Sequence, residues 1–173
     1  MPERDEIHVM PDGTRIRLRP IRADDGPALA DFVAHHMTAE DLRFRFFAPL
    51  KELSPALVER LTHPDPAREV AIAATFPQDD APIAVGRLAA NLEENRAEYA
   101  LAVQSEHKGH GIGYFLLGRL IAIARARGYR EIFGLVLRDN ERMLQMAGEY
   151  GFRRADEPAE PGVVRVSLDL VSR

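Results

Sequence analysis

A loop with glycine at every second position, residues 109–113, constrains this chain more than any other feature. It follows an apolar stretch typical of a strand and precedes an apolar stretch typical of a helix. Glycine lets the backbone turn tightly and expose its N–H groups, and the positive end of the helix dipole adds to their attraction for negative charge. The loop therefore predicts a strand–loop–helix unit that binds an anion such as a pyrophosphate.

The spacing of the glycines distinguishes this loop from two common kinds of phosphate-binding loop. A dinucleotide fingerprint needs G-x-G-x-x-G, but counting from Gly109 or Gly111 its third glycine falls on Tyr114 or Leu116. A Walker loop ends in G-K-[ST], whereas Gly113 is followed by two aromatic residues. Both fingerprints are therefore excluded.

Size and charge narrow the class of protein. The 173 residues predict one domain spanning 1–173, and the net charge of −4 leaves no basic surplus for nucleic acid. No apolar run approaches the roughly 20 residues of a membrane span, and the N-terminus is too charged for a signal peptide. The absence of cysteine excludes disulfides. We expect a cytoplasmic protein without nucleic-acid or membrane partners, and nothing in the sequence indicates its oligomeric state.

The N-terminal part reads as one strand followed by three helices. Residues 14–20 alternate between polar and apolar side chains, which is typical of a half-buried strand. Helices are expected after polar capping residues, which are Asp24 or Asp25, then Thr38, then Ser54 with Pro55 at the first helical position.

The rest of the chain predicts strands around two helices. Short polar connections join three strands into an antiparallel meander, and a helix between two later strands implies a parallel crossover. The expected strands are 69–76, 83–92, 97–104, 131–137 and 163–171, and the expected helices are 113–127 and 140–150.

Two motif blocks resemble those of the GNAT N-acetyltransferases. Read from Lys108, K-G-H-G-I-G is similar to the family's Q/R-x-x-G-x-G/A loop, with lysine in place of glutamine or arginine. The segment from Asn140 and Met143 to Gly151-Phe152 is similar to its N-x-x-M/A…G-F signature. The resemblance covers the whole chain. It implies an α/β (α+β) GNAT fold: a mixed central sheet with an antiparallel N-terminal meander and a parallel crossover at the acyl-coenzyme A site, flanked by helices.

The resemblance further implies an acetyltransferase whose cosubstrate is acetyl-coenzyme A. The strand end at 101–103 then splays from its parallel neighbour and pairs with the pantetheine arm. Lys108 and His110 add positive charge, and Asn140 is a helix cap, a cosubstrate contact or both. The expected contacts are Leu101, Ala102, Val103, Lys108, Gly109, His110, Gly111, Ile112, Gly113, Tyr114, Asn140 and Met143; no metal site is expected.

A narrower resemblance points to the acceptor. Blocks such as Arg19-Pro20-Ile21-Arg22, Arg43-Phe44-Arg45-Phe46-Phe47 and Ala97-Glu98-Tyr99-Ala100 look like those of bacterial Pat-type protein lysine acetyltransferases. A protein lysine is therefore the expected amine acceptor. A small amine, a protein N-terminus, and a non-catalytic domain that binds acyl-coenzyme A remain alternatives.

Acetylating a lysine first requires its deprotonation. With a pKa near 10.4, losing that proton at pH 7 costs about 4–5 kcal/mol, and a positioned carboxylate can help. Glu98 is the candidate base because it shares a strand face with the small residues Ala100 and Ala102, which leave room for a ligand. Pat-type domains carry a glutamate at the matching position. The alternative is that Glu98 simply pairs with an arginine.

The general acid and the acceptor groove are less defined. The family's usual acidic tyrosine corresponds here to Ala147, and Tyr150 one turn on is either a substitute or a packing residue. Residues 43–47 either line an acceptor groove or form a helix with a buried aromatic face and a solvated basic one. A thiol pKa near 8.5 makes the leaving thiolate tolerable without an enzyme acid.

Overall fold

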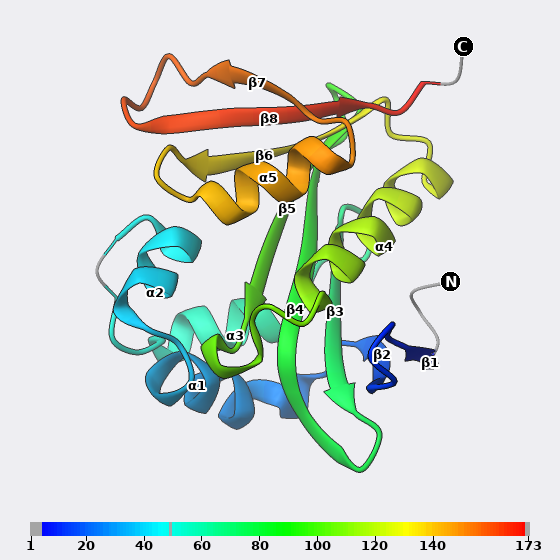
Figure 1. Cartoon of the computed structure of the whole chain (residues 1–173), viewed down its shortest axis with the longest axis vertical. Coiled ribbons are helices and arrows are strands. Elements are labelled where there is room, and N and C mark those ends of the chain that lie inside the picture. Colours follow the sequence, from blue (N-terminus) through cyan, green and yellow to red (C-terminus); the bar gives the residue numbers. More distant parts are fainter. Residues whose placement is uncertain (1–4, 49, 172–173) are drawn as a thin grey trace.

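The computed structural model describes residues 5–48 and 50–171, so the first four residues of the charged N-terminal stretch lie outside it. Its centre is an eight-stranded sheet in the order β1-β2-β3-β4-β5-β6-β8-β7 (Figure 1). Neighbouring strands of the described chain are antiparallel except for the parallel pair β5–β6, as the crossover predicts. The strands are β1 Glu6–Val9, β2 Arg15–Pro20, β3 Glu69–Phe76, β4 Asp79–Asn91, β5 Arg96–Val103, β6 Glu131–Leu137, β7 Arg153–Asp156 and β8 Val163–Asp169.

Helices cover the sheet from two sides and create two cores. Figure 1 shows α4 and α5 in front of the strands, and the larger core includes buried residues of both helices and of β2–β6. A smaller core joins α1, α2 and the α2–α3 connection to β3 and β4. Adjacent residues of β3 enter different cores, Ile72 the larger and Ala73 the smaller, as alternation along a strand requires. The helices are α1 Gly26–His35, α2 Ala39–Phe46, α3 Pro55–Thr62, α4 Ile112–Ala126 and α5 Glu141–Glu149.

Three predicted helix caps are confirmed and one is wrong. Thr38, Ser54 and Asn140 accept hydrogen bonds from the first turns of α2, α3 and α5. Asp25 stands at the N-cap of α1 but makes no capping bond. Its carboxylate instead pairs in bidentate fashion with buried Arg19, at 2.7 and 2.9 Å, because a charged partner from a neighbouring strand outcompetes the helix N–H groups.

Strand boundaries depart from expectation where side-chain alternation is weak. β4 begins at Asp79 rather than at 83, and Pro82 lies inside it, where the pairing with β3 shifts register and the missing N–H is tolerated. Two strands were not predicted: β1, and the fully exposed β7. Both are short edge strands, so few buried positions mark them in the sequence.

The parallel pair at the centre of the sheet opens along its length. The ladder between β5 and β6 spans only Arg96–Glu98 and Glu131–Phe133 within the described chain. Farther along β5, Leu101–Val103 remain paired with β4 alone. This splayed strand end leads directly into the glycine loop, so it lies beside the start of α4.

Candidate active site

The glycine loop has the backbone geometry that anion binding needs. Gly109 and Gly111 both have φ of +85°, a left-handed conformation that side chains rarely adopt. Gly111 is the N-cap of α4 and provides no capping side chain, so the N–H groups of the first turn lack the partner that a serine or aspartate would supply. These N–H groups and the helix dipole together favour a negatively charged ligand.

A cavity of about 470 Å³ opens in front of this loop, between β5 and α5. It is lined by all but one of the residues expected to contact the cosubstrate, that is Leu101, Ala102, Val103, Lys108, Gly109, Gly111, Ile112, Gly113, Tyr114, Asn140 and Met143. His110 is the exception, because its exposed side chain does not line the cavity. A Cβ built on Gly113 would lie 3.6 Å from Met146 and Val103, which is an ordinary van der Waals distance, so the start of α4 packs close to both side chains.

Lys108 lines the cavity but its ammonium group is already paired. The Nζ atom donates to Asp41 Oδ1 at 2.6 Å, and Ser105 Oγ donates to the other carboxylate oxygen at 2.5 Å. These two hydrogen bonds hold the pKa of the Asp41 carboxyl below its usual value, although burial opposes them. The contact ties the segment before the glycine loop to α2. We call this group of Asp41, Ser105 and Lys108 the loop latch.

The cavity fits an acyl-coenzyme A molecule. The uncapped helix start and the glycine loop suit a pyrophosphate, and the unpaired edge of β5 suits an amide-rich arm that needs backbone partners. When bound there, acyl-coenzyme A supplies an activated acyl group as a thioester.

A second cavity, of about 300 Å³, adjoins the first one and contains Glu98. The two cavities share Phe44, Arg45, Leu101, Asn140 and Met143, so they meet over the middle of β5. The Glu98 side chain is open to solvent at the cavity mouth, but the surrounding protein still withdraws water from the carboxylate. This desolvation raises the pKa of Glu98, and the positive charges of Arg165 and Arg45 oppose the rise. The carboxylate of Glu98 therefore lies in a cavity that adjoins the one in front of the glycine loop.

Tyr150 has the contacts of a packing residue. Its hydroxyl donates to the Tyr114 carbonyl at 2.7 Å, and the two rings stack with centroids 4.3 Å apart. A Cβ at Gly118 would lie 2.5 Å from the Tyr150 hydroxyl, so glycine at this helix position lets the Tyr150 ring pack closely against α4. Burial and the neighbouring Tyr114 raise the pKa of Tyr150 to about 12. Ala147, where the family usually has tyrosine, is fully buried.

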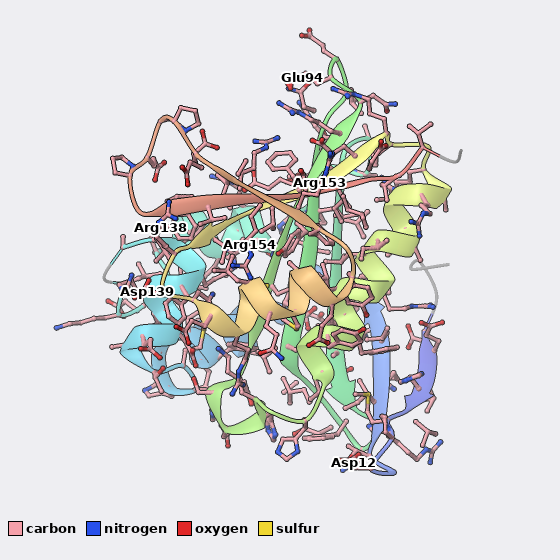
Figure 2. All side chains as sticks on the ribbon, turned by 45° about the horizontal axis from the view of Figure 1, so that its top comes forward. Asp12, Glu94, Arg138, Asp139, Arg153 and Arg154 are labelled. Atoms are coloured by element: carbon pink, nitrogen blue, oxygen red, sulfur yellow. The ribbon has the colours of Figure 1, made fainter. Side chains whose placement is uncertain are left out.

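Residues 43–47, the arginine- and phenylalanine-rich segment, contribute some side chains to the surface and others to the two cavities. Arg43 is exposed and pairs with Asp139, which Figure 2 shows on the side of the molecule where α2 lies. Phe44 and Arg45 line both cavities, so the basic residues of this helix do not share one solvated face.

Several residues that line the first cavity were missed in the sequence, namely Met37, Asp41, His107, Arg142, Gln145, Met146 and Glu149. Four of them lie on α5, and the spacing 142, 145, 146 and 149 continues the face marked by Met143. Helical periodicity applied from that motif residue could have found these four. Met37, Asp41 and His107 carry no such signal.

The described part of the chain has neither a metal-binding cluster of side chains nor a membrane-spanning helix. Within it, no cluster of three or more His, Cys, Asp or Glu side chains could hold a metal ion. None of its helices is both long and apolar enough to cross a membrane.

Comparison with known proteins gives consistent matches. Residues 35–152 match the acetyltransferase (GNAT) family. Acetyltransferase PA5475 of Pseudomonas aeruginosa is 27% identical over 154 residues, which cover 88% of this chain and 82% of that protein. The GNAT domain of S. lividans PAT is 34% identical with a TM-score of 0.86, and the match covers 96% of this chain and 97% of that one. A spermidine N-acetyltransferase from Vibrio cholerae, solved with CoA and spermine, shares the fold at 18% identity and TM-score 0.74, covering 90% and 95%.

Proposed function

Because this chain belongs to the acetyltransferase (GNAT) family, we propose that it transfers the acetyl group of acetyl-coenzyme A to a lysine side chain of a protein. The observation that carries the proposal is the meeting of the two cavities over β5. One cavity has the features of an acyl-coenzyme A site, and the other presents a carboxylate to an incoming amine.

In this proposal the glycine loop and the start of α4 hold the pyrophosphate through backbone N–H groups. The free edge of Leu101–Val103 orients the pantetheine arm, and Asn140 and Met143 close the opposite wall. The family uses acyl-coenzyme A, and acetyl-coenzyme A is the specific cosubstrate that we propose.

Glu98 is the proposed base. Its carboxylate takes the proton of the lysine ammonium, directly or through a water, before the neutral amine attacks the thioester carbonyl. A raised pKa makes the Glu98 carboxylate a stronger base than an ordinary glutamate. The thiolate then leaves without a dedicated acid, which agrees with the buried alanine at 147.

A protein lysine is favoured over a small amine by two observations. Glu98 lies at the exposed mouth of its cavity, where a side chain carried on a bulky protein can reach it. The similarity to the GNAT domain of S. lividans PAT extends over almost the full length of both chains.

A thiol-release assay with acetyl-coenzyme A tests the proposal. Folded lysine-containing proteins should be acetylated faster than polyamines, with labelled lysines identified by mass spectrometry. Glu98→Gln should lower turnover by about 100-fold or more while keeping affinity for acetyl-coenzyme A. Glu93→Gln, in the exposed β4–β5 turn, is the matched control and should change neither.

Two results would contradict the proposal. Turnover of polyamines without labelled protein would make the acceptor a small amine. Binding of acetyl-coenzyme A without thiol release to any acceptor would instead indicate a regulatory domain.

A further inference from the structure

Arg45 is an unusual residue because it is half-buried without a carboxylate partner in contact within the described chain. Its guanidinium stacks on the Phe46 ring, with 4.8 Å between the guanidinium carbon and the ring centroid. Across residues 5–48 and 50–171, no carboxylate oxygen lies within 4 Å of it, whereas Arg43 two residues earlier is exposed and paired with Asp139. A cation that is partly withdrawn from water is costly unless a nearby negative charge compensates it.

The charge that faces Arg45 is Glu98. The two side chains come from α2 and β5 and line the same cavity. Burial lowers the pKa of Arg45 and raises that of Glu98, and in each case the opposite charge of the other residue acts against the effect of burial. Arg45 therefore stabilises the ionised form of Glu98 at the place where the two cavities meet.

The other cations near Glu98 have carboxylate partners of their own. Arg165 of β8 lies 3.6 Å from Glu131 and 3.9 Å from Glu157. Arg96, two residues before Glu98 on the same strand, contacts Glu131 at 3.4 Å and also pairs with a turn glutamate. Arg45 differs from both because it lines the same cavity as Glu98 and has no carboxylate within 4 Å in the described chain.

Two further charged groups complete the surroundings of this pair. Arg87 of β4 is half-buried near Arg45, and it donates to the Leu61 carbonyl at 2.8 Å. Glu160, from the β7–β8 connection, lines the cavity of Glu98. The cavity of Glu98 is thus lined by two carboxylates and one guanidinium, those of Glu98, Glu160 and Arg45.

We propose that Arg45 is a positioning residue that keeps the Glu98 carboxylate ionised and directed toward the junction of the two cavities. This inference rests on the proposed function, because it gives Arg45 a role in the proton removal assigned to Glu98. In this arrangement partial desolvation makes Glu98 a better base, and the positive charge of Arg45 opposes its protonation.

The direct test is a ¹³C NMR titration of the Glu98 carboxyl in the free protein. Arg45→Met should raise the pKa of Glu98 by roughly one unit, because an opposite charge nearby is removed. Arg45→Lys keeps the positive charge, so the pKa of Glu98 in this variant should lie close to the wild-type value. Arg43→Met on the same helix is the matched control and should leave the pKa of Glu98 unchanged.

Kinetics supply a second measurement. In Arg45→Met the acidic limb of the kcat/KM profile should move to higher pH with the pKa of Glu98, and the rates should approach wild type at high pH. Should Arg45→Met fail to fold, Arg45→Gln carries the same two measurements.

An unchanged pKa of Glu98 in a folded Arg45→Met variant would overturn the inference. So would a loss of kcat/KM that is equal at all pH values, which indicates a structural role alone. The NMR titration needs no turnover, so it tests the role of Arg45 even if the proposed function fails. The proposed function is tested separately by the turnover of Glu98→Gln.

Discussion

Breaking the loop latch should weaken binding of acetyl-coenzyme A whichever charged partner is removed. The sequence alone suggests that Lys108 attracts the pyrophosphate by its charge. In the structure its Nζ atom is bound to Asp41 at 2.6 Å. If the charge acted on the ligand, Asp41→Asn would free the lysine and tighten binding. If the latch acts by holding the loop in place, Asp41→Asn and Lys108→Met should both weaken binding.

The expected magnitude follows from the exposure of the pair. The Asp41 side chain is 11% exposed and that of Lys108 is 30% exposed, so solvent screens the pair only in part. A charge-assisted hydrogen bond contributes about 1.5–3 kcal/mol, and the exposure of the lysine reduces this to about 1–2 kcal/mol. Either variant should lower Tm by about 2–8 °C. Affinity should fall about 5–30-fold if the loop loses the same stabilisation.

The latch also predicts a dependence on pH. The pKa of Asp41 is lowered in the folded state, so its contribution is complete above the unfolded value of about 3.9 and is lost as pH falls through the lower folded value. The difference in stability between wild type and Asp41→Asn should therefore shrink below about pH 4.

The assay compares wild type with the two single variants and their double mutant. Calorimetry measures their affinity for acetyl-coenzyme A, and thermal unfolding measures their Tm. The double mutant should lose little more than either single variant, because both remove the same contact. Tighter binding by Asp41→Asn, with a steeper dependence on salt, would refute the reasoning and return Lys108 to the role of a phosphate ligand.

Three further predictions follow from other contacts. Gly111→Val should lower affinity for acetyl-coenzyme A before it unfolds the protein, because a φ of +85° costs an L residue about 1–2 kcal/mol; unchanged affinity by calorimetry would contradict this. Tyr150→Phe should retain nearly full turnover and lose about 0.5–1.5 kcal/mol of stability with its hydrogen bond to Tyr114; a large loss of turnover at unchanged Tm would make it the general acid. Asp25→Asn should destabilise by about 1.5–3 kcal/mol, because Arg19 loses its bidentate charged partner but keeps Asp80 at 3.1 Å, and a Tm within 2 °C of wild type would be inconsistent with the importance of that pair.

Much of the fold is predictable from the sequence because its signals are local. The capping residues Thr38, Ser54 and Asn140 each act within one helical turn, and the strands 69–76 and 131–137 agree with the structure at both ends. Where a residue has a stronger distant partner, the local signal fails, as at Asp25.

The candidate site is predictable only in part. The glycine loop is visible in the sequence because its spacing and the helix that follows it are contiguous. His110 belongs to the same motif, yet its side chain does not line the cavity, because alternate positions of a tight turn face different directions. The contribution of α5 beyond Met143 depends on which face of that helix packs against the sheet.

The sequence by itself determined the order of the five helices and of β2–β6 and β8, the glycine loop and the strand that carries Glu98, because each depends on residues that are near neighbours in the chain. Only the tertiary structure decided that Lys108 is tied to Asp41, 67 positions earlier, and that Arg45 faces Glu98 across a cavity. Such contacts depend on how helices pack on a sheet, and no short stretch of sequence encodes that packing.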